Sequence, residues 1–190
     1  MALHEVPFAS ANGRDEIQAW IHVPAAAPRG AVQIIHGLGE HSRRYIHLIT
    51  ALLDAGFVVA ADDHAGHGRT AMRSGVWQDA GEDGARVVVQ DEQTLRETVA
   101  ERFPGLPHVV FGHSWGSMIA RVLASRHPQG LAGLVQPSPV RGEERHLLLP
   151  LRPSPAQILK VPLRLREPFL LGGVQVAPRP FPSPLGQFLQ

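Results

Sequence analysis

The residues best suited to covalent chemistry lie in the stretch FGHSWGSMIA, residues 111–120, where Ser114 is the centre of a G-x-S-x-G pattern. This spacing is typical of a serine held on a sharp turn between a strand and a helix. An apolar run precedes the pattern and a helical segment follows it, which is the context that the motif requires. Ser114 is therefore the candidate nucleophile of an acyl transfer. The alternative is a Gly-Ser turn without chemistry.

A second glycine-bearing loop, HGLGEHS at residues 36–42, follows the apolar run AVQII. Gly37 and Gly39 would let the backbone present an amide to a carbonyl oxygen. A tetrahedral intermediate needs two preorganised N–H donors to hold its oxyanion. We expect the amides of Leu38 and Trp115 to be these donors. The alternative is that HGLG is only a flexible turn.

A serine becomes a good nucleophile only when a histidine takes its proton and a carboxylate orients that histidine. Where a G-x-S-x-G serine lies on such a strand-to-helix turn, the acid and then the histidine follow it in the chain. The acids and histidines available after Ser114 are Glu143, Glu144, Glu167, His127 and His146. His127 ends the helix that begins at the serine, about 18 Å away, and His146 lies among prolines with no expected strand to position it. The triad acid and histidine stay unassigned.

Histidines and aspartates gather on two loops at one edge of the expected sheet: His36, His41, Asp62, Asp63, His64 and His67. Imidazole and carboxylate are zinc ligands, so a metal site is one interpretation. The spacings H-x-x-x-H and H-E-x-x-H are absent from the sequence, however. We expect no metal and no cofactor. His113, which strand alternation turns away from Ser114, is a poor candidate base.

The elements that must position these residues alternate between strands and helices. An alternating segment at 17–23 predicts an edge strand, and apolar runs predict buried strands at 31–35, 57–61, 108–111 and 131–135. Helices are expected from an N-cap at Ser42 to Gly56, over 84–103 and over 115–127, with a loop at 70–83. This order predicts the α/β class, with a mostly parallel sheet.

The whole-chain composition is that of a globular protein. The chain has 190 residues, enough for one domain, with 44% hydrophobic and 18% charged residues and a net charge of +1. We therefore expect no nucleic-acid partner. There is no cysteine, and we see neither a signal peptide nor an apolar run long enough for an integral membrane segment. The expected location is cytoplasmic, and the oligomeric state is left open.

The chain divides into two kinds of sequence near Gln136. Residues 1–136 carry 11 Arg against 14 acidic residues, whereas residues 137–190 carry 7 Lys and Arg against 3 Glu and hold 11 of the 17 prolines. Frequent proline breaks both helices and ladders, so we expect irregular or disordered structure at 137–190. Seventeen Arg against one Lys indicate a GC-rich coding sequence, and a frameshift or truncation is our hypothesis for this Pro/Arg/Leu-rich tail.

Three motifs in this order, HGLGEHSRRY, DDHAGHGRT and GHSWGSMIA, resemble the monoacylglycerol lipase and lysophospholipase group of α/β-hydrolases, also described as serine aminopeptidase S33-like. The resemblance covers about residues 15–136. It implies a three-layer α/β-hydrolase sheet, here expected to lack its C-terminal strands. It also implies Ser114 as nucleophile, an oxyanion hole at Leu38 and Trp115, and a structural role for the loop 63–68. Monoacylglycerols, lysophospholipids and related esters are the implied substrates, without a cofactor.

Two functions remain open from the sequence. The first is a serine ester hydrolase that works through an acyl-enzyme on Ser114. The second is a catalytically incomplete α/β-hydrolase fragment that at most binds an acyl ligand or a partner. A third interpretation takes the proline-rich tail as a docking segment for an aromatic-lined groove.

Overall fold

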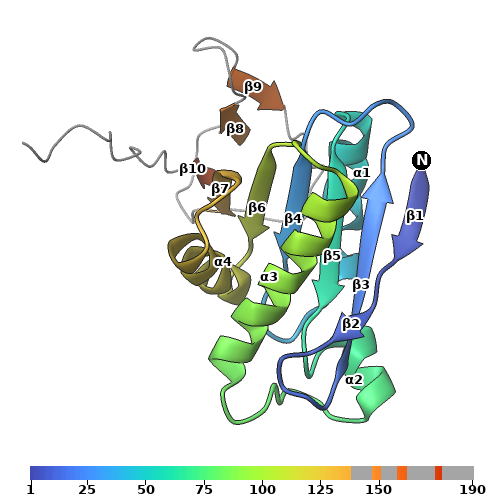
Figure 1. The fold of residues 1–190 in the computed structure, drawn as a ribbon, viewed down its shortest axis with the longest axis vertical. Helices are drawn as coiled ribbons and strands as arrows, with labels where there is room; N and C mark the ends of the chain where they lie inside the picture. The colour runs from blue at the N-terminus through green and yellow to red at the C-terminus, as the bar shows by residue number, and fades with distance from the viewer. Residues whose placement is uncertain (138–146, 151–157, 162–173, 177–190) are drawn as a thin grey trace, which may run out of the picture.

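The structure is a computed structural model that describes residues 1–137, 147–150, 158–161 and 174–176, with side chains for residues 1–136. A twisted sheet forms its middle layer, with helices on both faces (Figure 1). Helices α3 and α4 lie on the face toward the viewer and α1 lies on the opposite face. This three-layer arrangement is the one that the sequence predicts.

The elements of residues 1–137 are, in chain order, β1 (Ala2–Glu5), β2 (Phe8–Ala9), β3 (Glu16–Val23), β4 (Ala31–Ile35), the 3₁₀ turn η1 (Ser42–Tyr45), α1 (Ile46–Asp54), β5 (Val58–Asp63), α2 (Gly68–Ser74), α3 (Gly84–Arg102), β6 (His108–Gly112), α4 (Trp115–Arg126) and β7 (Leu131–Pro137). The three remaining described segments are β8 (Leu147–Pro150), β9 (Ile158–Val161) and β10 (Val174–Val176).

The sheet has the order β1-β3-β5-β4-β6-β7-β10, and β2 pairs with β3. Strands β5, β4, β6 and β7 are parallel neighbours, whereas β1 and β3 are added antiparallel. All residues of β4, β5 and β6 are buried. Because both faces of these strands are covered, their sequences are predominantly apolar and do not alternate between apolar and polar residues. The carboxyl ends of β4 and β6, which carry the two glycine loops, therefore meet at one edge of the sheet.

Each face of the sheet has its own apolar core. On one face α1 packs Leu48, Ile49 and Leu52 against β4, β5 and β6. On the other face α3 and α4 pack residues such as Val88 and Leu123 against β4 and β6. The apolar positions of α1 recur at helical spacing, and Gly56, with φ of +84°, follows its end. This glycine end is where the sequence predicts it.

Three local predictions are wrong. The strand at 16–23 is not at the edge, because β1 pairs with it along Ala2–Glu5. Residues 70–74 of the loop expected at 70–83 belong instead to α2, which ends at Gly75 in the left-handed conformation. Ser42 does not cap a helix; its hydroxyl donates 2.7 Å to Asp63 Oδ1 instead. In each case a partner distant in sequence decides the local structure.

The expectation of irregular structure at 137–190 falls mostly on residues outside the described ones. Strands β8 and β9 pair antiparallel with each other, and β10 pairs antiparallel with β7. The sheet therefore continues one strand past β7. Among the residues described, none of the helices combines the length and hydrophobicity that a bilayer span requires.

Candidate active site

Ser114 lies on the sharp turn that the G-x-S-x-G pattern predicts. It follows β6 directly, precedes α4 directly, and has φ of 52° and ψ of −120°. A serine rarely adopts positive φ, and such strained residues are concentrated at functional sites. Within residues 1–136 its hydroxyl has no hydrogen-bond partner, while its carbonyl accepts from the amide and hydroxyl of Ser117. The Ser114 hydroxyl is thus left free of hydrogen bonds to residues 1–136.

Two glycines make this turn sterically possible. A Cβ on Gly112 would lie 2.4 Å from the Gly116 carbonyl oxygen. A Cβ on Gly116 would lie 2.2 Å from the oxygen of Ile35 and 2.5 Å from that of His36. Real Cβ atoms do not approach oxygen so closely, so both positions require glycine. The start of α4 therefore lies directly against the end of β4.

This packing brings the loop after β4 next to the nucleophile. A Cβ built on Gly37 would lie 3.2 Å from Ser114 Cβ. The amides of Leu38 and Trp115, expected as oxyanion donors, have no acceptor among the described residues. The Trp115 amide belongs to the first residue of α4, where no intrahelical acceptor exists. Trp115 directly follows Ser114, and Leu38 directly follows Gly37 on the neighbouring loop.

Glu40 connects this loop to the serine turn, and the sequence alone did not point to this role. Its Oε1 accepts hydrogen bonds from the Gly37 amide at 2.6 Å, from Tyr45 Oη at 2.6 Å and from His113 Nδ1 at 3.0 Å. Burial alone would raise the pKa of Glu40, but these donors hold it below its ordinary value. The spacing from Gly37 to Glu40 is the three-residue spacing of side-chain capping and was the available signal.

The same contacts account for His113. Its Nδ1 is used by Glu40, and its ring lies 6.0 Å from the Tyr45 ring in an edge-on arrangement. His113 thus connects the serine turn to η1. It was expected to be a poor base, and its partners are those of a positioning residue.

Three of the loop histidines form a buried stack beneath the site. The rings of His36 and His64 are stacked at 3.8 Å between centroids, and the His67 ring stacks on Trp115 at 5.7 Å. Burial lowers the pKa of His36 and of His67, so both are neutral at pH 7. His36 Nδ1–H donates to the Gly37 carbonyl, and its Nε2 accepts from the His64 amide. The stack fixes the loops at both strand ends.

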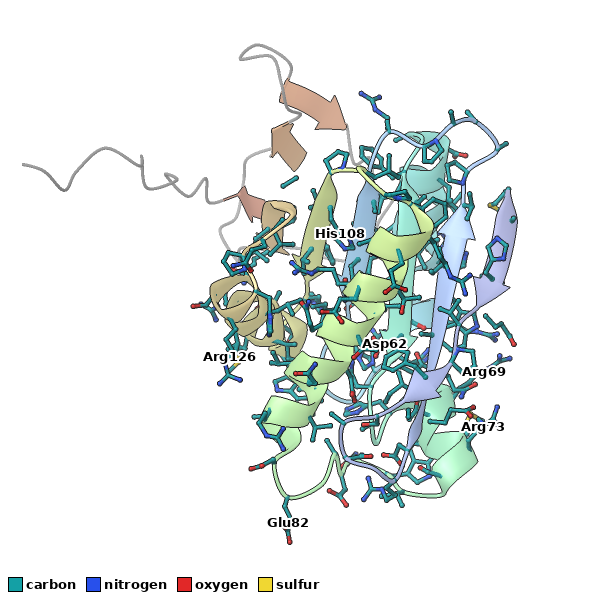
Figure 2. The ribbon with its side chains drawn as sticks, in the orientation of Figure 1. Asp62, Arg69, Arg73, Glu82, His108 and Arg126 are labelled. Carbon is teal, nitrogen blue, oxygen red and sulfur yellow. The ribbon has the colours of Figure 1, made fainter. Side chains whose placement is uncertain are left out.

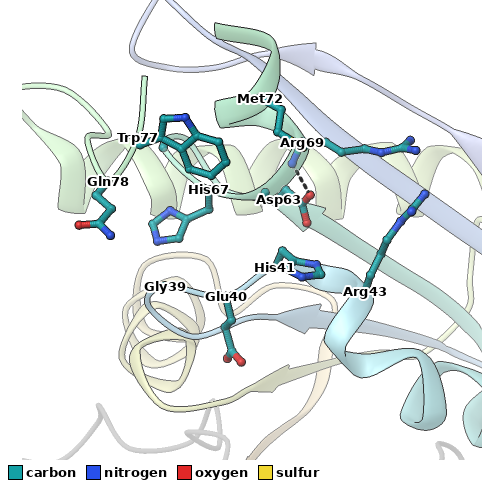
Figure 3. A pocket seen from close by; sticks show the side chains of 12 residues that line it. Gly39, Glu40, His41, Arg43, Asp63, His67, Arg69, Met72, Trp77 and Gln78 are labelled. Atoms are coloured by element: carbon teal, nitrogen blue, oxygen red, sulfur yellow. Dashed lines mark hydrogen bonds between the residues drawn. The ribbon is translucent and has the colours of Figure 1, made fainter. Parts of the chain in front are cut away.

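Asp63 holds the second loop in place. One of its carboxylate oxygens accepts from the Ser42 amide and hydroxyl, and the other accepts from the Arg69 amide at 2.7 Å, the dashed line in Figure 3. It thus joins η1 to α2. The structural role expected for residues 63–68 matches these contacts.

A hollow of about 530 Å³ lies between these two loops and α2 (Figure 3). Gly39, Glu40 and His41 line one side, and the other side is formed by residues of the second loop, α2 and the segment after it, among them His67, Met72 and Trp77. Ser114 is not among its lining residues. One of its lining residues, His67, stacks on Trp115, the residue that follows Ser114.

The triad partners are not found within residues 1–136. Of the acids and histidines considered after Ser114, only His127 lies in this part of the chain, and it follows the far end of α4. Glu143, Glu144, His146 and Glu167 lie outside the described residues. The described part of the chain brings Ser114 next to Gly37 and to the start of α4, and no histidine there is hydrogen-bonded to the serine hydroxyl.

Comparison with known proteins agrees with this geometry. The family model described as serine aminopeptidase, S33 matches residues 26–172. Monoglyceride lipase of Homo sapiens is 35% identical over 117 residues, which cover 62% of this chain and 37% of that protein. Monoacylglycerol lipase of Mycolicibacterium smegmatis is 35% identical over 136 residues, 71% of this chain and 46% of that protein.

Solved structures show the same fold. A thermostable carboxyl esterase from Bacillus coagulans superposes with a TM-score of 0.69 at 56% identity, covering 70% of this chain and 43% of the esterase. A lipase in an open form superposes with a TM-score of 0.68 at 66% identity. The chain spans less than half the length of these relatives. The matched residues contain both glycine loops and the serine turn, and the chain belongs to the serine aminopeptidase S33 family of α/β-hydrolases.

Proposed function

We propose that this protein is a serine hydrolase of carboxylic esters, with Ser114 as the nucleophile that forms the acyl-enzyme. The observation that carries the proposal is the strained turn at Ser114, with φ of 52°, between β6 and α4. The amides of Leu38 and Trp115 would hold the oxyanion, because neither has an acceptor among the described residues. The helix dipole of α4 adds positive potential at the same point.

The substrate class that we propose is a monoacylglycerol, a lysophospholipid or a related acyl ester. Two relatives that share the matched region are named for monoacylglycerol or monoglyceride hydrolysis, and a similar structure is a carboxyl esterase. Acyl transfer of this type needs a nucleophile, an oxyanion hole and a proton acceptor, and it needs no metal.

A second candidate, the catalytically incomplete fragment, is favoured by one observation. Within residues 1–136 no histidine contacts the hydroxyl of Ser114, so nothing there can take its proton. In this case the chain would bind an acyl ligand or partner without turnover.

Labelling with a fluorophosphonate and hydrolysis of a short-chain chromogenic ester distinguish the two. The hydrolase predicts stoichiometric labelling and turnover, both abolished in Ser114→Ala and retained in Ser125→Ala, an exposed serine of the same helix. An oxyanion hole without a base would still give a rate roughly 10³ to 10⁴ above water, so the Ser114→Ala background must be subtracted. Folded protein that is neither labelled nor active would refute the hydrolase and support the fragment.

A further inference from the structure

Three ligand-type side chains meet in the core away from Ser114. Asp62 and His64 lie at the carboxyl end of β5, and Glu92 lies on α3, which covers that strand. Figure 2 shows Asp62 beside α3, toward the opposite end of the strands from His108. All three residues are at most 1% exposed. The sequence pointed to the first two, but not to Glu92, because only the packing of α3 brings it to this loop.

The polar atoms of this cluster are poorly satisfied by the protein. Both carboxylate oxygens of Asp62, Oε1 of Glu92 and Nδ1 of His64 make no hydrogen bond, although each is fully buried. His64 Nδ1 lies 3.4 Å from Asp62 Oδ1 and 3.4 Å from Glu92 Oε1, longer than the usual 2.7–3.2 Å of an N–H···O bond. Buried polar groups are ordinarily paired, so such a group of orphans needs an explanation.

The separations fit one small cation. Three ligand atoms, one from each side chain, lie within 4.8 Å of one another. A tetrahedral zinc ion with bonds of about 2.0–2.1 Å has ligands about 3.4 Å apart, and the two contacts of His64 Nδ1 have this length. The remaining pair of ligand atoms, on Asp62 and Glu92, is at most 4.8 Å apart, so binding would draw these two carboxylates closer together.

The surroundings prepare His64 as a ligand. Its Nε2 lies 3.3 Å from the His36 carbonyl oxygen. A proton on Nε2 donates to this carbonyl and leaves the Nδ1 lone pair directed at the two carboxylates. Metal-ligating histidines are ordinarily oriented by such a bond from the other ring nitrogen. Glu92 is oriented in turn by Gln33 Nε2, which contacts its carboxylate and donates 2.8 Å to its backbone carbonyl.

The local charge also favours a divalent cation. Two carboxylates and a neutral imidazole would place two negative charges in the core, which is costly unless they are neutralised. Burial and the neighbouring Asp62 charge raise the pKa of Glu92 well above its ordinary value. Burial opposes a charge on His64, but the carboxylates raise its pKa nonetheless. Protons and a metal ion therefore compete for the same negative potential.

We propose that Asp62, His64 and Glu92 form a buried structural site for a divalent transition metal, with Zn²⁺ as the best-fitting ion. Mixed imidazole and carboxylate ligands suit zinc, and a small ligand such as water would complete the tetrahedron. The ion would join α3 to the end of β5. It would also secure the histidine stack, since His64 packs on His36 and, edge-on at 5.5 Å, on Trp115.

The test is a titration of the full chain, first treated with a chelator, with Zn²⁺. We expect one equivalent to bind and the melting temperature to rise by roughly 5–10 °C when free Zn²⁺ is about 100 times the dissociation constant. Binding should release a proton, so the affinity should fall as the pH is lowered. Titration with Co²⁺ should give the visible absorption of a four-coordinate ion with a nitrogen ligand.

Glu92→Gln is the decisive variant, and Glu101→Gln, an exposed glutamate of the same helix, is its control. We expect Glu92→Gln to lower the affinity by at least about tenfold to a hundredfold and Glu101→Gln to leave it unchanged. Equal binding by Glu92→Gln would place the ion on the other histidines and overturn the proposal. The absence of stoichiometric binding to the wild-type chain would overturn it as well. If Glu92→Gln does not fold, the wild-type Co²⁺ spectrum decides, and a spectrum of hydrated Co²⁺ refutes the site.

Discussion

Gly116 provides the sharpest test of how the serine turn is held. A Cβ at this position would lie 2.2 Å from the Ile35 carbonyl oxygen and 2.5 Å from that of His36. Carbon–oxygen contacts are ordinarily about 3.3–3.6 Å, so in Gly116→Ala the start of α4 must move about 1 Å away from β4. Both obstacles are backbone atoms at the end of a central strand, which cannot swing aside as a flexible side chain would.

The expected cost follows from this overlap. Inserting a methyl group into a well-packed core lowers the free energy of unfolding by about 1–3 kcal/mol. Because the neighbours of Gly116 are backbone atoms, which cannot move aside easily, we expect a loss near 3 kcal/mol for Gly116→Ala. For a chain of this size, the loss corresponds to a melting temperature lower by roughly 6–12 °C. If Ser114 and the Trp115 amide act as proposed, a displacement of about 1 Å should also lower esterase activity by about a hundredfold.

Thermal and urea unfolding of Gly116→Ala measure this cost, with Gly84→Ala as the matched control. Gly84 begins α3 with ordinary φ, and the nearest atom to its added methyl is the Ala80 Cβ at 3.3 Å. We expect the control to change the free energy of unfolding by no more than about 0.5 kcal/mol. Insoluble Gly116→Ala beside soluble Gly84→Ala would agree with the reasoning. A melting temperature within about 1 °C of wild type would refute the close contact of α4 with β4.

Two further predictions concern charge and pH. Glu40→Gln should cost about 1–2 kcal/mol at pH 7, because its carboxylate accepts from Gly37, Tyr45 and His113. Since the pKa of folded Glu40 is lowered, this stabilisation is present above the ordinary pKa and lost as the pH falls through the lowered one; an equal cost in urea unfolding at pH 7 and pH 3 would contradict it. Burial lowers the pKa of His108 to about 4 from 6.5, so the unfolded chain binds its proton first, and wild-type stability should fall by up to about 3 kcal/mol between pH 6.5 and pH 4. His108→Gln should remove that slope, and an unchanged slope would assign it to other groups.

The central strands and long helices were predictable because burial on both faces or on one stripe leaves a strong local pattern. The runs AVQII and HVVF are mostly apolar and form β4 and β6. In contrast, β1 is exposed at all four residues and its sequence ALHE has no alternation. Its pairing with β3 comes from the sheet edge rather than from its own composition, so the sequence did not indicate it.

The site was predictable as far as its chemistry is local. Ser114 and the two amides lie within motifs whose backbone geometry is set by nearby glycines. Glu40 was not identified, because its role depends on donors from three separate positions. Glu92 was not identified either, since on α3 it has the sequence pattern of an ordinary polar helix position, and only tertiary packing buries it.

Under the proposed function, the described part of the chain contains one component of ester hydrolysis, the serine turn, without another, the proton acceptor. The strained conformation of Ser114 costs on the order of 1–3 kcal/mol. The packing of Gly112 against Gly116, and of Gly116 against the end of β4, maintains it without a hydrogen bond from the Ser114 hydroxyl to any histidine of residues 1–136. The proposed oxyanion donors would depend on the same packing, because the amide of Trp115 belongs to the first residue of α4. Proton transfer has no such support within residues 1–136. If Ser114 acts as proposed, variants of the glycine turn should therefore impair labelling and turnover together.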